Sequence, residues 1–156
     1  MIPGMGKPSK LGKRLKGVKK VYLDTNCFIY HYGRHPLFQP VSTEILLLIG
    51  EGKLQGVTSV LSVSEVLYRR LQKKPDEPLE YQRTLLSIQN LSLMFVDLEV
   101  AAKAAEIRLR YNLKAPDAIH YATALIHSCE VFITNDKIFK RVKEIPVLLI
   151  KDLSPS

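Results

Sequence analysis

The sequence is poor in the features that mark secreted and membrane-spanning proteins. It has only two cysteines, Cys27 and Cys129, which lie too far apart for the C-x-x-C spacing of a redox or zinc motif. Two cysteines cannot build the disulfide framework of a small secreted domain, so we expect free thiols in a reducing cytoplasm. The longest strongly apolar run, residues 45–49, is far too short to cross a bilayer, and no apolar segment of signal-peptide length follows the N-terminus. The composition therefore predicts a cytoplasmic protein without a membrane partner.

Several motifs of nucleotide-binding and hydrolytic enzymes are absent as well. The sequence has no GxxxxGK[ST] and no GxGxxG phosphate loop, which argues against an NTPase or a dinucleotide-dependent enzyme. It has no GxSxG elbow, so a serine hydrolase triad has little support. The histidines His31, His35 and His127 show no metal-ligand spacing with one another.

Acidic residues are missing from the first 20 positions, although seven of the chain's 23 Lys and Arg residues lie there. The formal net charge of +8 is therefore carried by the N-terminus, and the rest of the chain is nearly neutral. We expect residues 1–19 to form a flexible basic arm, which is either drawn to phosphate groups or is a solvated tail.

The remaining residues alternate between short apolar segments and amphipathic ones. The predicted strands are residues 20–23, 55–59, 93–96, 131–133 and 147–150. The predicted helices are residues 26–32, 40–51, 62–71, 79–91, 99–111 and 117–128. This alternation predicts βαβ units, that is, an α/β fold with three α/β/α layers around a short, mainly parallel sheet. The length is that of one domain, and we assign it to residues 20–152. Among the aromatic residues, Tyr22, Phe28, Tyr30 and Phe95 are predicted core.

Four acidic residues follow the predicted strands or begin the helices after them: Asp24, Glu65, Asp117 and Asp136. In a parallel α/β sheet the carboxyl ends of the strands share one edge, where ligands bind. Four carboxylates from distant parts of the chain are therefore expected to converge in one cleft.

Each acid also has a structural explanation. Asp24 and Asp136 precede helices and are suited to cap them. Glu65 lies three residues after Ser62, which is the spacing of a capping box. Asp117 lies in a first helical turn, where the helix dipole favours negative charge. Capping gives no reason for an acid at the end of a buried run, where desolvation is unfavourable.

A cluster of carboxylates is stable at neutral pH when it binds a divalent cation. Oxygen ligands suit Mg²⁺ or Mn²⁺ better than zinc. Two such ions roughly 3.5–4 Å apart activate a water and stabilise the leaving oxygen in phosphodiester cleavage.

Four short motifs carry a resemblance to a known family. They are Leu-Asp-Thr-Asn at 23–26, Ser-Glu-Val-Leu at 64–67, Pro-Asp-Ala at 116–118 and Ile-Thr-Asn-Asp at 133–136. In order and spacing they resemble the motifs of PIN-domain nucleases, most of all the VapC-type toxins of toxin–antitoxin pairs. The resemblance implies a Mg²⁺- or Mn²⁺-dependent ribonuclease in which Asp24, Glu65, Asp117 and Asp136 are catalytic and metal-binding. It also implies that Thr25, Asn26 and Thr134 orient those carboxylates.

The resemblance further implies a homodimer that is held inactive by an antitoxin protein. Candidate RNA contacts are Lys13, Arg14, Lys16, Arg69 and Arg70. The alternatives are an RNA-processing PIN nuclease outside a toxin–antitoxin pair and a non-catalytic RNA-binding or scaffolding module. An aspartyl phosphatase related to haloacid dehalogenases would need a second Asp at the position of Asn26. His120 shares a helix face with Asp117, and packing is the commoner reason for a histidine there.

Overall fold

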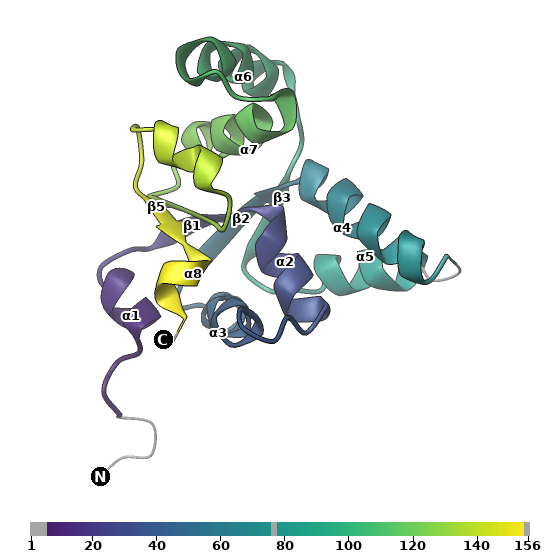
Figure 1. Ribbon diagram of the computed structural model, residues 1–156, viewed down its shortest axis with the longest axis vertical. Helices are drawn as coiled ribbons and strands as arrows, with labels where there is room; N and C mark the ends of the chain where they lie inside the picture. The colour runs from purple at the N-terminus through teal and green to yellow at the C-terminus, as the bar shows by residue number, and fades with distance from the viewer. Residues whose placement is uncertain (1–5, 76–77, 155–156) are drawn as a thin grey trace.

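A computed structural model of the protein describes residues 6–75 and 78–154, which form a parallel sheet between two layers of helices (Figure 1). The strands are β1 (Lys20–Leu23), β2 (Gln55–Ser59), β3 (Leu91–Met94), β4 (Val131–Thr134) and β5 (Val147–Leu149). Their order across the sheet is β3-β2-β1-β4-β5, and every neighbouring pair is parallel. The predicted three-layer α/β/α architecture is confirmed.

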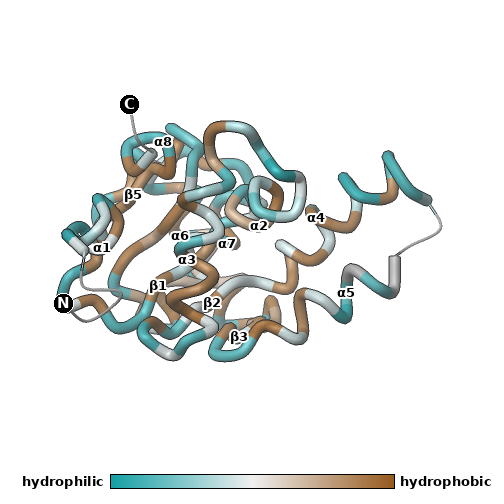
Figure 2. Tube along the Cα trace, turned by 90° about the horizontal axis from the view of Figure 1, so that it is seen from below, coloured by the Kyte–Doolittle hydropathy of each residue, from teal (hydrophilic) through white to brown (hydrophobic). Residues whose placement is uncertain are grey.

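The two faces of the sheet are covered by different parts of the chain. The face on the α2 side carries α1 (Lys10–Arg14), α2 (Thr25–Tyr32), α3 (Gln39–Gly50), α4 (Val60–Lys73), α5 (Pro78–Leu86) and α8 (Ile150–Leu153). The opposite face carries α6 (Leu98–Tyr111), α7 (Ala115–Ile126) and the 3-10 helix η1 (Lys137–Arg141). The α4–α5 pair projects to one side of the molecule (Figures 1 and 2). None of the helices in the described segments is long and apolar enough to cross a membrane.

Alternation along the strands builds a separate core on each face. In β1, Val21 and Leu23 pack in the core on the α2 side, and Tyr22 packs in the core beneath α6 and α7. The Tyr22 ring stacks on Phe132, with ring centroids 5.0 Å apart. Figure 2 shows apolar stretches both in the central strands and on the helices that cover them, such as α3. Burial on both faces explains why the strands are mainly apolar, with polar residues such as Lys20, Gln55 and Thr134 at their ends.

The third strand differs from its prediction. It spans Leu91–Met94 rather than 93–96, because α5 ends at Leu86 and Asn90 takes a left-handed conformation with φ 62° just before the strand. Phe95 therefore lies beyond the end of an edge strand and is 77% exposed. Its assignment to the core is wrong, because the described residues leave most of its side chain uncovered.

The N-terminal segment is docked on the domain where we expected a flexible arm. Residues 10–14 form α1, whose N-cap Ser9 accepts a hydrogen bond from the Gly12 amide at 2.9 Å. Leu11 and Leu15 are 1% and 6% exposed and belong to the core on the α2 side. The four-residue spacing of these leucines gives the basic segment one apolar face. Residues 1–5, which the expectation also covered, lie outside the described residues.

This docking predicts a stability effect. Leu11→Ala is expected to lower the free energy of unfolding by about 2–3 kcal/mol, because it removes most of a leucine side chain that is 1% exposed in the core. Leu109→Ala is the matched control, since Leu109 is 90% exposed and its truncation should change stability by less than about 0.5 kcal/mol. Urea denaturation followed by circular dichroism measures both. Equal effects would mean that the N-terminal segment does not contribute to the core.

Candidate active site

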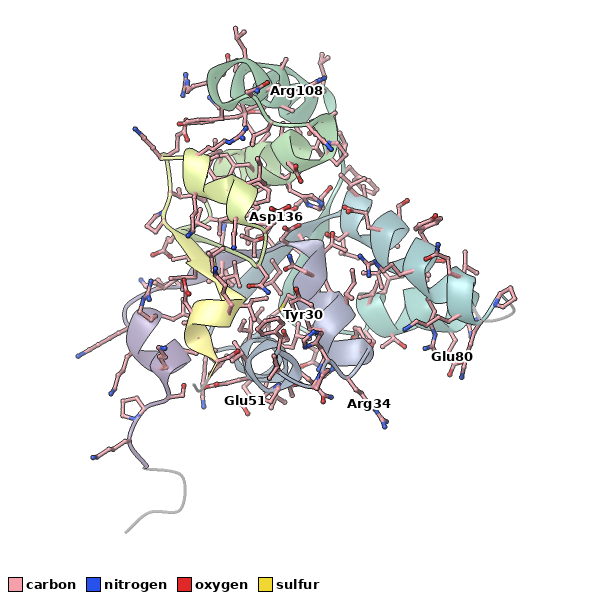
Figure 3. All side chains as sticks on the ribbon, in the orientation of Figure 1. Tyr30, Arg34, Glu51, Glu80, Arg108 and Asp136 are labelled. Carbon is pink, nitrogen blue, oxygen red and sulfur yellow. The ribbon has the colours of Figure 1, made fainter. Side chains whose placement is uncertain are left out.

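The four acidic residues predicted to converge line one pocket of about 410 Å³ at the carboxyl edge of the sheet. Its lining residues are Asp24, Thr25, Asn26, Ile29, Glu65, Tyr68, Arg69, Asp117, His120 and Asp136. They come from four separate places: the β1–α2 junction, α4, α7 and the end of β4. Asp136, labelled in Figure 3, lies between α7 and α2. Parallel strands explain this convergence, because β1 and β4 are neighbours and end at the same edge.

Asp24 is held on both of its carboxylate oxygens. It is 7% exposed, and its Oδ1 accepts a hydrogen bond from the Thr25 amide at 2.8 Å as the N-cap of α2. Its Oδ2 accepts from the Thr134 hydroxyl at 2.7 Å. The cap and the pocket-lining role therefore coexist in one residue. Asp136 likewise caps η1, accepting from the Ile138 amide at 3.0 Å, while it lines the pocket.

Thr134 connects Asp24 to the two polar residues beside it. It is completely buried behind Asp24, and its oxygen accepts from the Asp136 amide at 3.1 Å and from the Asn26 side-chain nitrogen at 3.5 Å. The single hydroxyl proton of Thr134 goes to Asp24, so Asn26 must present its NH₂ group to Thr134. The Asn26 Oδ1 atom is consequently buried without a hydrogen-bond partner among the described residues.

Glu65 is held by a chain of hydrogen bonds that crosses the sheet. The His120 Nε2 atom donates to Glu65 Oε1 at 2.6 Å, and the Thr25 hydroxyl donates to the same oxygen at 3.1 Å. On its other side, the His120 Nδ1 atom lies 2.7 Å from the Tyr22 hydroxyl, which accepts from the Ser59 amide at 3.1 Å. His120 is 2% exposed. We call this set the Tyr22–His120–Glu65 chain.

The capping-box explanation of Glu65 is wrong. Helix α4 begins at Val60, and its N-cap is Ser59, whose hydroxyl accepts from the Leu61 amide at 3.1 Å. Glu65 therefore lies in the second turn of the helix, where its carboxylate bonds to side chains from other elements.

Proton affinities in the pocket reflect these contacts. Partial burial by itself raises the pKa of Glu65, but the hydrogen bond and charge of His120, with the Thr25 bond, hold that pKa below its usual value. Burial by itself lowers the pKa of His120, but the bond to Glu65 and the charges of Asp24, Glu65 and Asp117 raise it. Burial raises the pKa of Asp117, and so do the negative charges of Asp136, Asp24 and Glu65. The pocket is therefore crowded with negative charge.

The donor set suits a hard divalent cation. The groups that face the pocket are carboxylate, hydroxyl and amide oxygens, with one imidazole already committed to Glu65. The charge crowding at Asp117 and the unpartnered Asn26 oxygen are both features that a bound cation would relieve. Within the described ranges, no three His, Cys, Asp or Glu side chains stand in a group that could hold a metal ion. The residues fit a cation by chemistry and position, and their side chains would need to close around it.

The predicted basic contacts are spread over three places. Arg69 lines the pocket beside Glu65. Arg70 lines an adjacent hollow between α2 and α4. Lys13 and Arg14 are in α1 and Lys16 follows it, and none of these three lines the pocket.

Sequence reasoning did not connect two residues to the site. His120 was assigned to packing and Tyr22 to the core, although both belong to the Tyr22–His120–Glu65 chain. A signal for His120 was present, because it lies one helical turn after Asp117. Nothing in the sequence pairs Tyr22 with His120, since 98 residues separate them.

The Tyr22–His120–Glu65 chain predicts a stability effect. Tyr22→Phe keeps the buried ring but leaves the Ser59 amide and His120 Nδ1 without their partner, so we expect a loss of about 1–3 kcal/mol. Tyr68→Phe, at a side chain that is 65% exposed, should leave stability unchanged. Chemical denaturation of both variants measures the difference. If Tyr22→Phe is as stable as the parent protein, the hydrogen bonds of the Tyr22–His120–Glu65 chain contribute nothing to stability.

Comparison with known proteins identifies one matching family and several solved structures of similar fold. The family model described as PIN domain matches residues 21–145. No curated protein matches the chain. VapBC2 from Rickettsia felis, solved bound to a promoter DNA fragment, is similar in structure with a TM-score of 0.67 at 18% identity, covering 83% of this chain and 98% of that one. A toxin–antitoxin complex from Klebsiella pneumoniae gives 0.62 at 26% identity, with coverages of 83% and 97%. DNA-bound VapBC from Salmonella typhimurium gives 0.66 at 19%, with coverages of 85% and 98%.

Proposed function

The chain belongs to the PIN domain family, and from this membership we propose that it is a metal-dependent endoribonuclease that hydrolyses phosphodiester bonds in RNA. PIN domains are generally nucleases, which supports a hydrolase acting on nucleic acid. One observation carries the proposal most: carboxylates from four separate segments line a single pocket, and a buried, unpartnered amide oxygen belongs to Asn26 in its wall. Capping requires no such convergence.

In this proposal Asp24, Asp117, Asp136 and Glu65 hold Mg²⁺ or Mn²⁺. When bound, such an ion lowers the pKa of the attacking water and neutralises charge on the scissile phosphate. Thr134 fixes the Asp24 carboxylate through its hydrogen bond to Oδ2. Thr25 and His120 fix Glu65 in the same way, and residues of this kind set how well a carboxylate binds its ion. Asn26 supplies a further oxygen, and Arg69 a positive charge for the substrate backbone.

We further propose that the protein is the toxin of a type II toxin–antitoxin system, acting in the cytoplasm as a homodimer and inhibited by an antitoxin. Support comes from the structural neighbours, three of which are described as toxin–antitoxin complexes or VapBC. The buried free thiols of Cys27 and Cys129 agree with a reducing compartment. The second candidate is a PIN nuclease of RNA processing, for which the docked basic segment at α1 is the specific support, because the compact toxins resembled here typically lack it.

The nuclease proposal is tested with a circular single-stranded RNA, which has no ends for an exonuclease. The purified protein is incubated with this RNA in Mg²⁺, in Mn²⁺ and in EDTA, and the products are separated on a denaturing gel. We expect linear and shorter products with either ion and intact circles in EDTA. Cleavage that continues in EDTA would overturn the metal dependence, and intact RNA under all conditions would overturn the activity.

The toxin assignment needs a separate test. Induced expression in a bacterial host is expected to stop growth, and an Asp24→Asn variant expressed at the same level is expected to permit it. RNA cleavage in vitro without growth arrest would instead favour the processing nuclease.

A further inference from the structure

We propose that α1 and α8 form a second nucleic-acid contact, a basic hollow that binds single-stranded RNA where it leaves the candidate active site. The proposal rests on the proposed ribonuclease function and extends it to substrate binding. The hollow has a volume of about 570 Å³. Its principal lining residues are Lys10, Arg14, Lys151, Leu37, Phe38 and Asp152.

The two helices that carry the cations of the hollow are anchored to the core. Lys10 and Arg14 belong to α1, which is anchored through the buried side chains of Leu11 and Leu15. Lys151 belongs to α8, and the other α8 residues Ile150 and Leu153 are buried in the same core. All three cationic side chains are exposed, and none forms an ion pair within the described part of the chain. Three cations against the single carboxylate of Asp152 leave the hollow with an excess of positive charge.

The hollow adjoins the candidate active site through the register of the sheet. In the β4–β5 ladder Thr134 pairs with Leu149, so Asp136 and Lys151, each two residues beyond this last pair, follow the two strands at the same edge of the sheet. The Asn135 Oδ1 atom accepts a hydrogen bond from the Lys151 amide at 2.9 Å, which fixes this arrangement. A strand whose scissile phosphate lies at the four carboxylates therefore meets Lys151 next, and then the cations of α1.

Apolar groups in the hollow favour a single strand over a duplex. Leu37 is 66% exposed in the hollow, and Phe38, which is partly buried against the core, lines it next to Leu37. Single-stranded RNA presents unpaired base faces to such groups while cations contact its backbone. A duplex keeps its base faces stacked inside and offers mainly phosphates and hydroxyls. The main competing occupant is an acidic polypeptide. It would bind the same cations but would not be continuous with a substrate in the candidate active site.

The test uses salt dependence, because each phosphate contact to a single strand contributes about 0.7 to the slope of log affinity against log salt. The triple variant Lys10→Ala, Arg14→Ala, Lys151→Ala is compared with the control Lys53→Ala, Arg83→Ala, Arg108→Ala. The control removes the same net charge from exposed sites outside the hollow. Arg108, for instance, lies far from the site on α6 (Figure 3). Both triple sets are placed on an Asp24→Asn background with EDTA present, so that the labelled RNA stays intact during anisotropy titrations in KCl.

We expect the hollow variant to reduce the slope by about 2 and the control to leave it unchanged. Equal slopes in the two variants would overturn the proposal. So would a hollow variant that keeps its RNA slope but loses binding of a labelled poly-glutamate peptide, since that result assigns the hollow to an acidic protein. The binding assay requires no cleavage. Its result can therefore be interpreted even if the protein proves not to be a ribonuclease.

Discussion

Asp24→Asn is expected to lower the rate of RNA cleavage by about 10³-fold or more while leaving the fold intact. In the proposed mechanism Asp24 holds the ion, and loss of such a carboxylate removes several kcal/mol of transition-state stabilisation. Each 1.36 kcal/mol corresponds to about tenfold in rate. Asparagine is as good an N-cap as aspartate, so its oxygen can keep the hydrogen bond from the Thr25 amide. The amide NH₂ would then face Thr134, which can accept this bond when the Asn26 amide flips and takes the Thr134 hydroxyl proton on its Oδ1.

Asp97→Asn is the matched control for this substitution. Asp97 is the N-cap of α6, where it accepts from the Val100 amide at 2.9 Å, and it does not line the pocket. The same chemical change there should leave the cleavage rate within about twofold and stability within about 0.5 kcal/mol. A steady-state cleavage assay and a denaturation curve for each variant give both quantities. An Asp24→Asn variant that cleaves as well as Asp97→Asn would remove Asp24 from the catalytic set.

The second large effect is expected in thermal unfolding with a divalent cation. At a Mn²⁺ concentration about 100 times Kd, binding to the folded state alone adds about 2.7 kcal/mol of stability. For a chain of this size that corresponds to a rise in Tm of about 5–10 °C. We expect this rise for the parent protein and for Asp97→Asn, and its loss for Asp117→Asn. Differential scanning fluorimetry with and without Mn²⁺ measures it without any RNA.

Without the cation, Asp117→Asn should melt at the same temperature as the parent or slightly above it. Burial raises the pKa of Asp117 in the folded state, as do the charges of Asp136, Asp24 and Glu65. An acid whose pKa is raised by folding is ionised at neutral pH at the expense of stability, and the penalty fades as the pH falls through the folded pKa. Asparagine removes that penalty, which is below about 1 kcal/mol because Asp117 is partly exposed and screened. The assignment of Asp117 as a cation ligand would be contradicted if Mn²⁺ did not change the Tm of the parent. It would also be contradicted if Mn²⁺ still raised the Tm of Asp117→Asn.

The fold and the convergence of the four acids could be predicted because both depend on local patterns. Apolar segments of strand length alternate with amphipathic ones, and Asp24 and Asp136 follow strands that must end at the same edge. The four acids do line one pocket, as the shared edge requires. Their catalytic role stays a prediction.

Features that depend on packing between distant segments could not be predicted. The Tyr22–His120–Glu65 chain joins three elements through side chains, and periodicity identified Tyr22 and His120 only as buried. Residues 1–19 were predicted to be a flexible arm because basic residues dominate their composition. The burial of two leucines at helical spacing, which anchors α1, was not foreseen. Phe95 is apolar but extends past the end of an edge strand, and only the tertiary fold determines what covers it.

The strand order determines when the pocket can assemble during translation. Strand β4 lies beside β1, yet Ile133 and Leu23 are partners from opposite ends of the domain. Asp24 and Glu65 are made early on the ribosome, and Asp117 and Asp136 are made late. Asp24 also lacks its Thr134 hydrogen bond until β4 has been made and has paired with β1. A nascent chain therefore has half of the carboxylates and no assembled pocket. If the protein cleaves RNA, its own messenger and ribosome are protected from it until translation of the domain is almost finished.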